Sequence, residues 1–406
     1  MKNIKILFNL LAILSLSFLI YLIAKSPLYS IYDEFIFVEN LRLFEKLGLN
    51  NTFLISLKNQ SPGPLYQIIH YLFKPIGDNS MIVMRFINLG LFLLTLFFTY
   101  LILSKKRHAI EITGMYLALP MTWVIVGMAL SEIPSMLFCV IFLYLLQLVL
   151  NLKYDYKVTQ NLIVILAGLA LGLSIVGRSP FLMVVAACPV FFLLEDRRIL
   201  TITLIVSSVI LPAYLFTQWG GLVPPDVQGI QSGINPMYLF LALGYMAFLT
   251  LIIAHEWYNL PKEYFIYTII ITIIFIILNI NFHFISSEPL KSFSDKYFSS
   301  QVISIYKYMI PGITMGLGLF YLSSCAFHMI TNRKDVFFLF NLVAGLLILM
   351  TTIKSSAQFS SRYVIQASPF FLLAYADYVK LNVKTFSLQI IGTLLGVLSL
   401  IGYYKL

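Results

Sequence analysis

The sequence predicts an all-α protein that crosses a membrane many times, and two observations lead to this fold class. The first is composition: 60% of the 406 residues are hydrophobic and 11% are charged, whereas a typical soluble domain has roughly 45–50% and 25%. The mean hydropathy is +0.91. No soluble fold buries that much apolar surface, and disordered or disulfide-stapled secreted chains are excluded as well. We expect a single transmembrane domain over residues 1–406.

The second observation is a series of apolar runs long enough to span a bilayer, which takes about 20 helical residues. About thirteen such runs follow one another along the chain. They lie at 6–24, 81–104, 109–128, 133–151, 160–177, 180–194, 199–218, 237–254, 263–281, 308–330, 335–352, 363–379 and 386–403. Lys2 and Lys5 precede the first run, and no small-residue cleavage site follows it, so we expect an uncleaved signal anchor. Pro180 and Pro189 make the 160–194 region the least regular.

Tight loops rich in Lys and Arg mark the cytoplasmic side of a membrane protein. Placing the N-terminus inside gathers 14 of the 27 basic residues on that side and puts the C-terminus outside. These are Lys2, Lys5, Lys105, Lys106, Arg107, Lys153, Lys157, Arg197, Arg198, Lys262, Arg333, Lys334, Lys380 and Lys384. The net charge of +10 is thus spread over loops that flank the membrane, and we expect no nucleic-acid partner.

Three outer loops are longer than a turn in this orientation. The first, at about 25–80, is the longest, and the loops at 219–236 and 282–307 are smaller. The 219–236 loop is rich in Gly and Pro, so it is either a segment that covers a substrate or a flexible connector.

Two segments of the first outer loop have the pattern of amphipathic helices that lie in the membrane interface. One is 33–47, whose apolar positions among the charges are Phe35, Val38, Leu41 and Leu43. The other is 64–73, with Pro64 in its first turn. Before it, Gln60 to Tyr66 places two prolines around a glycine, which predicts a rigid, non-helical approach.

Charged residues next to hydrocarbon are costly and mark functional sites by default. On the inner side only Glu111 and Asp377 stand out. On the outer side lie Asp33, Glu34, Arg85, Glu132, Arg178, Lys354 and Arg362. A site that combines carboxylates and cations at the outer face is the simplest interpretation. The alternative is interface anchoring with structural ion pairs.

The carboxylates have two interpretations each. Asp33 and Glu34 begin an interfacial helix, where the helix dipole favours acidic residues, or they include a general base at the membrane surface. Glu132 lies in a tight turn between two spans. There Ser131 can cap the start of a helix, with Glu132 satisfying free N–H groups, or Glu132 is a second carboxylate of the site.

The segment from Lys354 to Tyr363 brings two cations, Lys354 and Arg362, and four serines to the outer edge of a helix, and Pro369 follows seven residues after Arg362. Cations, hydroxyls and a helix N-terminus together favour an anion. A phosphate of a lipid-linked substrate fits this pattern, and ordinary headgroup anchoring is the alternative.

The three cysteines are expected to pack in the apolar interior and to have no catalytic, disulfide or metal-binding role. Cys139, Cys188 and Cys325 all lie inside apolar runs, without a CxxC pair or Cys/His spacing. No cluster of ligands implies a metal, so we expect no cofactor and leave a divalent cation open.

Five motifs in this order resemble the GT-C membrane glycosyltransferases, which use polyprenyl-phosphate-linked sugars. They are Asp33-Glu34, Pro62-Gly63-Pro64-Leu65-Tyr66, Arg85-Phe86-Ile87-Asn88, the turn Ser131-Glu132-Ile133-Pro134-Ser135, and Arg362-Tyr363 with Pro369. The fourth resembles the second acidic motif of the family, between the third and fourth spans, and the last resembles the late Arg-Tyr…Pro motif of the protein-mannosyltransferase-like and aminoarabinose-transferase-like branches. Tyr32 to Leu89 and the Trp219-Gly220-Gly221 loop are more similar to the dolichyl-phosphate-glucose alpha-1,2-glucosyltransferase family.

The chain also departs from this family's pattern. It lacks the soluble domain of oligosaccharyltransferases, and Phe35 stands where some branches have a histidine after the acidic pair. Glu132 stands where several branches have Asp. The excess of Lys over Arg, with abundant Ile and Asn, is typical of an AT-rich coding genome, which favours a bacterial source over N-glycan assembly.

The resemblance implies a GT-C-type fold and an inverting transfer from a polyprenyl-phosphate sugar to a glycan, lipid or protein acceptor. Asp33 would be the general base, supported by Glu34, and Glu132 would orient the acceptor or a cation. Arg362, then Lys354 and Arg178, would bind the donor phosphate. Tyr66, Arg85 and Tyr363 would position the acceptor or the loop.

Two other functions stay open beside the glycosyltransferase. One is an O-antigen ligase or polymerase, although those enzymes place their large functional loop late in the chain. The other is a lipid or sugar transporter, although internal repeats and midplane charges are not evident. The expected location is a bacterial inner or plasma membrane with the site on the periplasmic or extracellular face. In a eukaryote it would be the ER membrane with a luminal site.

Overall fold

The computed structural model describes residues 2–77, 80–152, 157–194, 197–229, 233–286, 299–354 and 359–405. Within these ranges every regular element is helical and no strand occurs, which confirms the all-α prediction for this part of the chain.

Ten helices in the described ranges are long and apolar enough to cross a membrane. They are α1 (Lys2–Ala24), α6 (Met81–Leu103), α9 (Glu132–Asn151), α10 (Lys157–Gly177), α12 (Arg198–Trp219), α14 (Pro236–Ala254), α15 (Lys262–Phe282), α17 (Ser300–Thr331), α18 (Val336–Met350) and α21 (Val383–Tyr404). The chain is therefore an integral, multi-pass membrane protein.

Three of the thirteen predicted spans are not single long helices. The run 109–128 divides into α7 (Ala109–Gly114), the 3-10 helix η1 (Met115–Ala118) and α8 (Pro120–Gly127), with a bend of 76°. The described residues thus contain ten full-length candidates, or up to eleven if this bent pair is one span. Pro120 accounts for the break, because it lacks an N–H for the helix that precedes it.

The other two runs are shorter for the same reason. The run 180–194 divides into η2 (Ser179–Phe181), α11 (Leu182–Ala187) and η3 (Cys188–Leu193). The run 363–379 holds only α19 (Arg362–Ile365) and α20 (Ser368–Tyr375). Pro180, Pro189 and Pro369 each stand in the first turn of one of these pieces.

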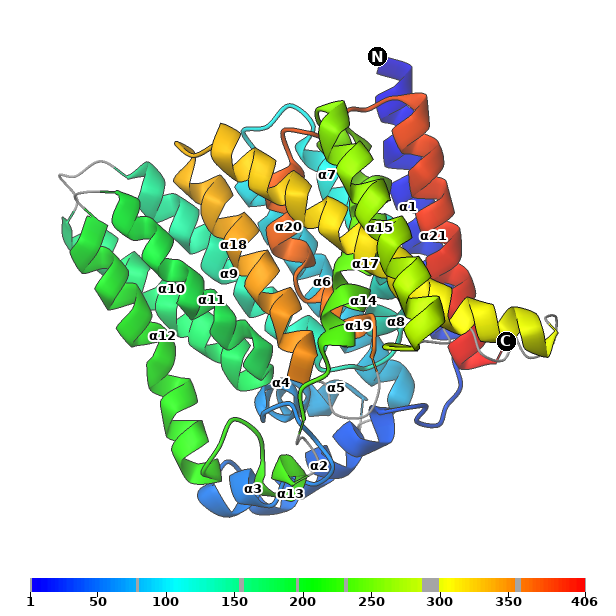
Figure 1. Cartoon of the computed structure of the whole chain (residues 1–406). Coiled ribbons are helices and arrows are strands. Elements are labelled where there is room, and N and C mark those ends of the chain that lie inside the picture. The colour runs from blue at the N-terminus through cyan, green and yellow to red at the C-terminus, as the bar shows by residue number, and fades with distance from the viewer. Residues whose placement is uncertain are drawn as a thin grey trace.

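The long helices form two groups with α18 and α20 between them (Figure 1). In one group α10 packs between α9 and α12, and α9 also contacts α6. In the other, α14 and α15 both pack on α17, while α21 packs on α1, α8 and α14. Helix α20 is too short to span a bilayer, yet Phe370, Phe371 and Leu372 are fully buried. The short pieces therefore belong to the core.

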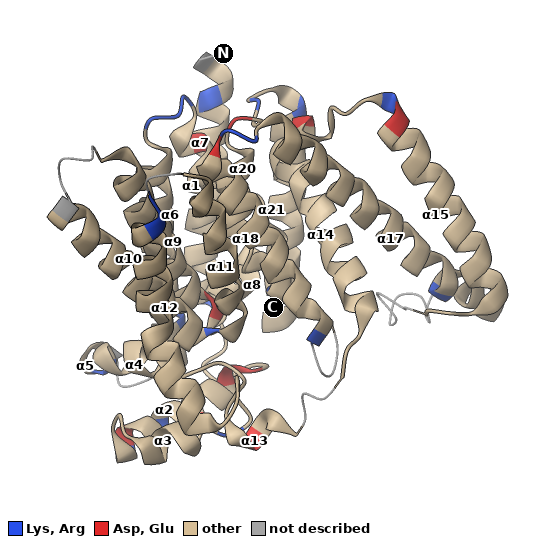
Figure 2. Cartoon of the chain, turned by 60° about the vertical axis from the view of Figure 1, so that its left-hand side comes forward, with Lys and Arg blue, Asp and Glu red and all other residues tan. Residues whose placement is uncertain are grey.

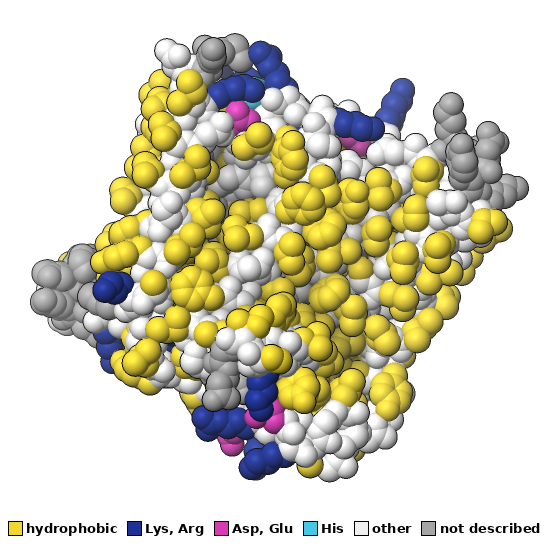
Figure 3. Space-filling model, turned by 180° about the vertical axis from the view of Figure 1, so that it is seen from behind, with side chains coloured by type: hydrophobic (Ala, Val, Ile, Leu, Met, Phe, Trp, Pro, Cys, Tyr) yellow, Lys and Arg dark blue, Asp and Glu magenta, His cyan; other side chains and the backbone are white. Residues whose placement is uncertain are grey.

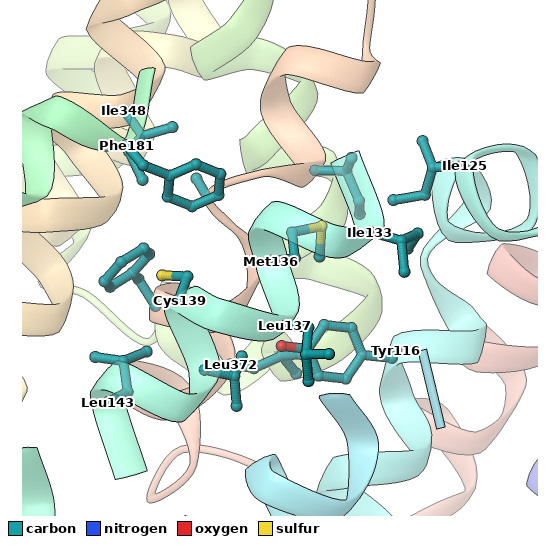
Figure 4. Close-up of a cluster of buried hydrophobic side chains, with 14 of the residues drawn as sticks. Tyr116, Ile125, Ile133, Met136, Leu137, Cys139, Leu143, Phe181, Ile348 and Leu372 are labelled. Carbon is teal, nitrogen blue, oxygen red and sulfur yellow. The ribbon is translucent and has the colours of Figure 1, made fainter. Parts of the chain in front are cut away.

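Figure 4 shows part of this core around α9. Its labelled side chains come from α8, α9, η1, η2, α18 and α20 and face one another. They are Tyr116, Ile125, Ile133, Met136, Leu137, Cys139, Leu143, Phe181, Ile348 and Leu372. All three cysteines of the chain are buried and free, as the sequence predicts.

Four short helices follow α1 in the first loop: α2 (Glu34–Leu47), α3 (Asn51–Ile55), α4 (Leu65–Leu72) and α5 (Lys74–Gly77). Helices are thus present at 33–47 and 64–73 as predicted, whereas their place in the membrane interface stays a prediction. The buried face of α2 includes Phe37, Val38, Leu41 and Phe44, but Phe35 is 56% exposed. The apolar face was therefore predicted partly wrong. Positions 37, 41 and 44 form the helical stripe.

Of the two smaller outer loops, the first runs from Trp219 to Pro236, between α12 and α14, as predicted, and the second is shorter than predicted. Within 219–236, residues Pro225–Gln228 form α13. Within 282–307, helix α17 already begins at Ser300, because the Ser299 side chain accepts a hydrogen bond from the N–H of Val302. Residues 287–298 of that loop lie outside the described residues.

Charged residues gather at two levels of the bundle (Figure 2), and a wide hydrophobic band lies between these levels on the face in Figure 3. We name one level the basic end, which holds the ion pairs Lys5–Glu111, Lys106–Asp377 and Lys380–Glu256. The other level is the site end, where Arg85 lies over the ring of Tyr404. The two chain ends are therefore at opposite levels. The compartment that each level faces stays a prediction.

Candidate active site

Four charged side chains from distant parts of the chain meet at the site end. Arg362 Nη2 donates to Asp33 Oδ2 at 2.7 Å, and its Nη1 lies 4.0 Å from Glu132 Oε1. The same Glu132 oxygen accepts a hydrogen bond from Arg178 Nη2. We call Asp33, Arg362, Glu132 and Arg178 the four-charge cluster. It brings together four of the residues that the sequence singled out.

Asp33 is the most accessible member of the four-charge cluster. Its side chain is 33% exposed, whereas those of Arg362, Arg178 and Glu132 are 9%, 10% and 0% exposed. Asp33 precedes α2, but its carboxylate makes no hydrogen bond to the N-terminus of that helix. Instead it reaches Arg362. Helix capping therefore does not explain this carboxylate.

Arg362 is held at the start of α19 by contacts on several sides. Its Nε donates to Ser360 Oγ, and its guanidinium lies 5.1 Å from the ring centre of Tyr32. Tyr32 in turn packs edge-on against Tyr403. A cation held over an aromatic face is attracted to the ring electrons. These contacts fix the direction in which Arg362 presents its donors.

Glu132 and Arg178 meet because α9 starts where α10 ends. Helix α9 packs closely on α10, and Ser174 Oγ donates to the carbonyl of Ser135. A Cβ on Gly177 would lie 2.2 Å from Ser135 Oγ, so the approach needs glycine there. Burial first, and then the positive charge of Arg362, lower the pKa of Arg178 to about 10. Its guanidinium therefore stays charged at neutral pH.

The turn before α9 differs from its predicted role. Ser131 occupies the capping position, but its side chain makes no capping bond. Its hydroxyl is buried and unpartnered, as are Glu132 Oε2 and Arg178 Nε. The prediction that Ser131 caps the helix is therefore wrong. Before Ser131 in the turn, the Leu130 carbonyl accepts a hydrogen bond from the Asn88 amide, and the Ala129 N–H donates to Glu34.

Glu34 and Arg85 form a separate buried pair next to the four-charge cluster. Both side chains are 0% exposed, and Arg85 donates to both oxygens of Glu34. The remaining Arg85 donors bind Ser26 Oγ and the carbonyls of Pro27 and Tyr29. This network fastens the connection between α1 and α2. The roles that the resemblance implies for Arg85, in positioning the loop or the acceptor, and for Glu34, in supporting Asp33, stay predictions.

The other predicted site residues lie further from the four-charge cluster. Tyr66 of α4 is buried against Phe37 and His70, and burial raises the pKa of its hydroxyl. Tyr363 follows Arg362 and lies within electrostatic range of Arg178. Lys354 ends the 3-10 helix η6 (Thr351–Lys354), is exposed, and makes no ion pair among the described residues.

The segment Pro62-Gly63-Pro64 packs against the C-terminal end of α10. The Gly63 N–H donates to the carbonyl of Gly177, and a Cβ on Gly63 would lie 1.9 Å from the carbonyl oxygen of Val176. Three buried amides hold the segment: Gln67 donates to Gln60, and Asn40 donates to Gln60 as well. The predicted rigid approach is thus built from amide side chains as well as prolines.

Two residues of the site were missed in the sequence. Tyr32 stacks on Arg362, and the signals were its place beside Asp33 and its position at the start of the family-like stretch from Tyr32 to Leu89. Gln366 is fully buried one helical turn after Arg362, with both amide atoms unpartnered. Its spacing of four residues from Arg362 could have pointed to it. Among the described residues, no three His, Cys, Asp or Glu side chains are grouped so as to hold a metal ion.

Comparisons with known proteins identify no sequence relative. No family model matches the chain, and no curated protein matches it. Two solved structures are similar at 12% identity and a TM-score of 0.44 over 96% of this chain. They are ArnT from Cupriavidus metallidurans in the apo state and bound to undecaprenyl phosphate, of which 76% and 77% are covered. A likeness this distant carries no argument about activity, so function is argued from the residues of the site.

Proposed function

We propose that the protein is a GT-C-type glycosyltransferase that moves a sugar from a polyprenyl-phosphate donor to a hydroxyl group of a glycan, lipid or protein acceptor. The observation that carries the proposal is the four-charge cluster. It combines one accessible carboxylate with two guanidiniums at one end of a membrane-spanning bundle. The order of the motifs around Asp33, Glu132 and Arg362 supports the same reaction.

Asp33 is the proposed general base. It accepts the proton of the acceptor hydroxyl while the oxygen attacks the anomeric carbon, and the bond from that carbon to the phosphate oxygen breaks. Its 33% exposed carboxylate can meet an acceptor, whereas Glu132 and Glu34 are closed off by the protein. Geometry therefore separates Asp33 from the other acidic residues of the motifs.

Arg362 and Arg178 are the proposed partners of the leaving phosphate. The phosphate changes from a diester to a monoester, so its negative charge grows as the bond breaks, and fixed cations stabilise that change. Arg362 now binds Asp33, so donor binding exchanges that contact for a phosphate oxygen. This exchange frees the carboxylate next to the phosphate. Lys354, exposed on η6, is a further candidate for the phosphate or the lipid headgroups.

The testing experiment is release of polyprenyl phosphate by the purified protein from a panel of polyprenyl-phosphate sugars, with membrane extract as acceptor. We expect Asp33→Asn to lower the rate by about 10²–10⁴-fold, because the substitution keeps the shape and removes the base. Asp377→Asn is the matched control, since Asp377 pairs with Lys106 at the basic end. It should release phosphate at the wild-type rate.

Other outcomes separate the alternatives. Full turnover by Asp33→Asn would show that Asp33 is not the base. If a polyprenyl-diphosphate-linked glycan is added as a second donor class, turnover of that donor alone, with release of polyprenyl diphosphate, would identify a ligase or polymerase. Movement of an intact lipid-linked sugar across vesicles without release would identify a transporter.

A further inference from the structure

Gln366 is a buried amide without a partner in the described structure. It is 0% exposed, and neither Oε1 nor Nε2 has a hydrogen-bond partner. A buried polar group left unpaired costs about 1–3 kcal/mol. Gln366 has two such atoms beside the four-charge cluster's Arg362, which indicates that the side chain is built to bind a polar group.

Gln366 lies opposite the turn that carries Glu132. It joins α19 to α20 and keeps a helical backbone, so its Cβ lies roughly 5–6 Å from the Cβ of Arg362, four residues earlier on the helix. Helix α19 packs on α8, and α20 packs on α9. Since Ser131 and Glu132 stand where α8 leads into α9, the two connections face each other.

The unpartnered polar atoms in this region have a common chemistry. Ser131 Oγ can donate and accept, Glu132 Oε2 accepts, Arg178 Nε donates, and the Gln366 amide does both. All four side chains are at least nine-tenths buried. A mixed set of donors and acceptors matches hydroxyl groups, each of which donates one hydrogen bond and accepts others.

We propose that Gln366, Ser131 and the free oxygen of Glu132 form the subsite for the hydroxyl groups of an uncharged donor sugar, which rests on the proposed function. We assign the subsite to the donor sugar and not to the acceptor, because Glu132 contacts Arg178 and lies near Arg362. These two arginines are the residues proposed to bind the donor phosphate. The sugar is bonded directly to that phosphate. Asp33, on the other side of Arg362, faces the acceptor.

The charges and the free donors favour an uncharged sugar over a uronic acid or an amino sugar. The four-charge cluster contains two carboxylates and two guanidiniums, so its formal charge is zero, and the donor phosphate adds one negative charge. A uronic acid would add a second negative charge to a buried site, which is costly. An ammonium group accepts no hydrogen bond, so an amino sugar would leave the free donors Arg178 Nε and Gln366 Nε2 unpaired.

The test measures binding and uses two ligands: undecaprenyl phosphate alone, and an undecaprenyl phosphonate that carries a hexose and is not cleaved. We expect Gln366→Met to weaken the hexose ligand by about tenfold or more while leaving undecaprenyl phosphate unchanged, because only the hexose ligand loses hydrogen bonds. Ser131→Ala should show the same selective loss and replaces Gln366→Met if that variant fails to fold.

The matched control is Gln389→Met. Gln389 is also a buried glutamine with an unpartnered Nε2, but it lines a small cavity with Glu111 at the basic end. This control should leave both affinities unchanged.

Deoxy donors locate the contact. The wild type should prefer the complete hexose over at least one analogue that lacks a hydroxyl, and Gln366→Met should remove that preference. An equal loss for both ligands, or no loss for either, overturns the proposed subsite. Selective hexose binding without turnover of any donor would keep the subsite and refute the glycosyltransferase reaction.

Discussion

At the scale of single residues, Tyr32 shows how the site holds Arg362. Its φ of 52° lies in the left-handed region, which costs a non-glycine residue on the order of 1–3 kcal/mol. The same conformation places its ring under the guanidinium of Arg362, a contact worth about 0.5–2 kcal/mol. The strained backbone of Tyr32 therefore helps to hold the Arg362 guanidinium between Asp33 and Glu132.

His70 gives the protein a sensitivity to acid. Burial lowers its pKa from 6.5 to about 3, so below pH 6.5 the unfolded chain takes up a proton that the folded protein does not. The free energy of unfolding therefore falls by about 1.4 kcal/mol per pH unit as the pH drops from 6.5 toward 3. We expect His70→Gln to remove this part of the pH dependence, measured by thermal unfolding in detergent between pH 7 and 4.

The control for this prediction is His283→Asn, at an exposed histidine. It should keep the wild-type slope. Parallel curves for wild type and His70→Gln would contradict the prediction.

A substitution of Gly63 tests the close contact between the Pro62-Gly63-Pro64 segment and the end of α10, just before Arg178. A methyl group there would meet the carbonyl oxygen of Val176 at 1.9 Å, so the segment must move away from α10. We expect Gly63→Ala to destabilise the protein by about 1–3 kcal/mol in thermal unfolding and to slow phosphate release. Gly90→Ala in α6 is the matched control, because nothing lies within 4 Å of its new Cβ. If both variants unfold alike, the close packing at Gly63 is not important.

At the scale of elements, the buried pair of Glu34 and Arg85 fixes where α2 begins. Glu34→Gln leaves a buried guanidinium without its counter-charge, which costs about 3–5 kcal/mol. Asp33→Asn changes a pair that is partly exposed and should cost about 1 kcal/mol or less. We expect the unfolding temperature in detergent to fall steeply for Glu34→Gln only. Equal shifts for the two neighbours would assign Glu34 a role other than anchoring.

The helices also show which parts of the fold can be predicted from the sequence. Hydropathy predicts the ten long helices, because the bilayer fixes their length. It overestimates the spans at 109–128, 180–194 and 363–379, since an apolar run that prolines divide reads the same whether it crosses the membrane or folds into the core.

The site was predicted in part. Motif order and the charges on the outer side brought Asp33, Glu132, Arg178 and Arg362 into one hypothesis, and their side chains meet. The pairing of Glu34 with Arg85 was beyond reach, because the two residues are 51 positions apart. The burial of Gln366 has no sequence pattern, and its spacing from Arg362 was the one signal that could have pointed to it.

At the scale of the whole molecule, the two levels of charge make the orientation testable. All three native cysteines are buried, so a cysteine placed at an exposed position is the reactive one. In intact cells, we expect a membrane-impermeant maleimide to label Lys354→Cys at the site end and not Lys105→Cys near the basic end, because basic loops stay inside. The reverse labelling pattern would place the candidate site in the cytoplasm.

The loop after α12 is joined to the rest of the site end by an indole. Trp219 Nε1 donates to the carbonyl of Leu54 in α3, and Asp226 accepts from the N–H of Asn59 nearby. The only other tryptophans, Trp123 and Trp257, are 0% exposed inside the bundle. Trp219 is therefore a natural optical probe. With the other two tryptophans replaced by phenylalanine, the wavelength of the Trp219 fluorescence emission would report in real time whether lipid-linked ligands break the contact with Leu54, without an attached dye.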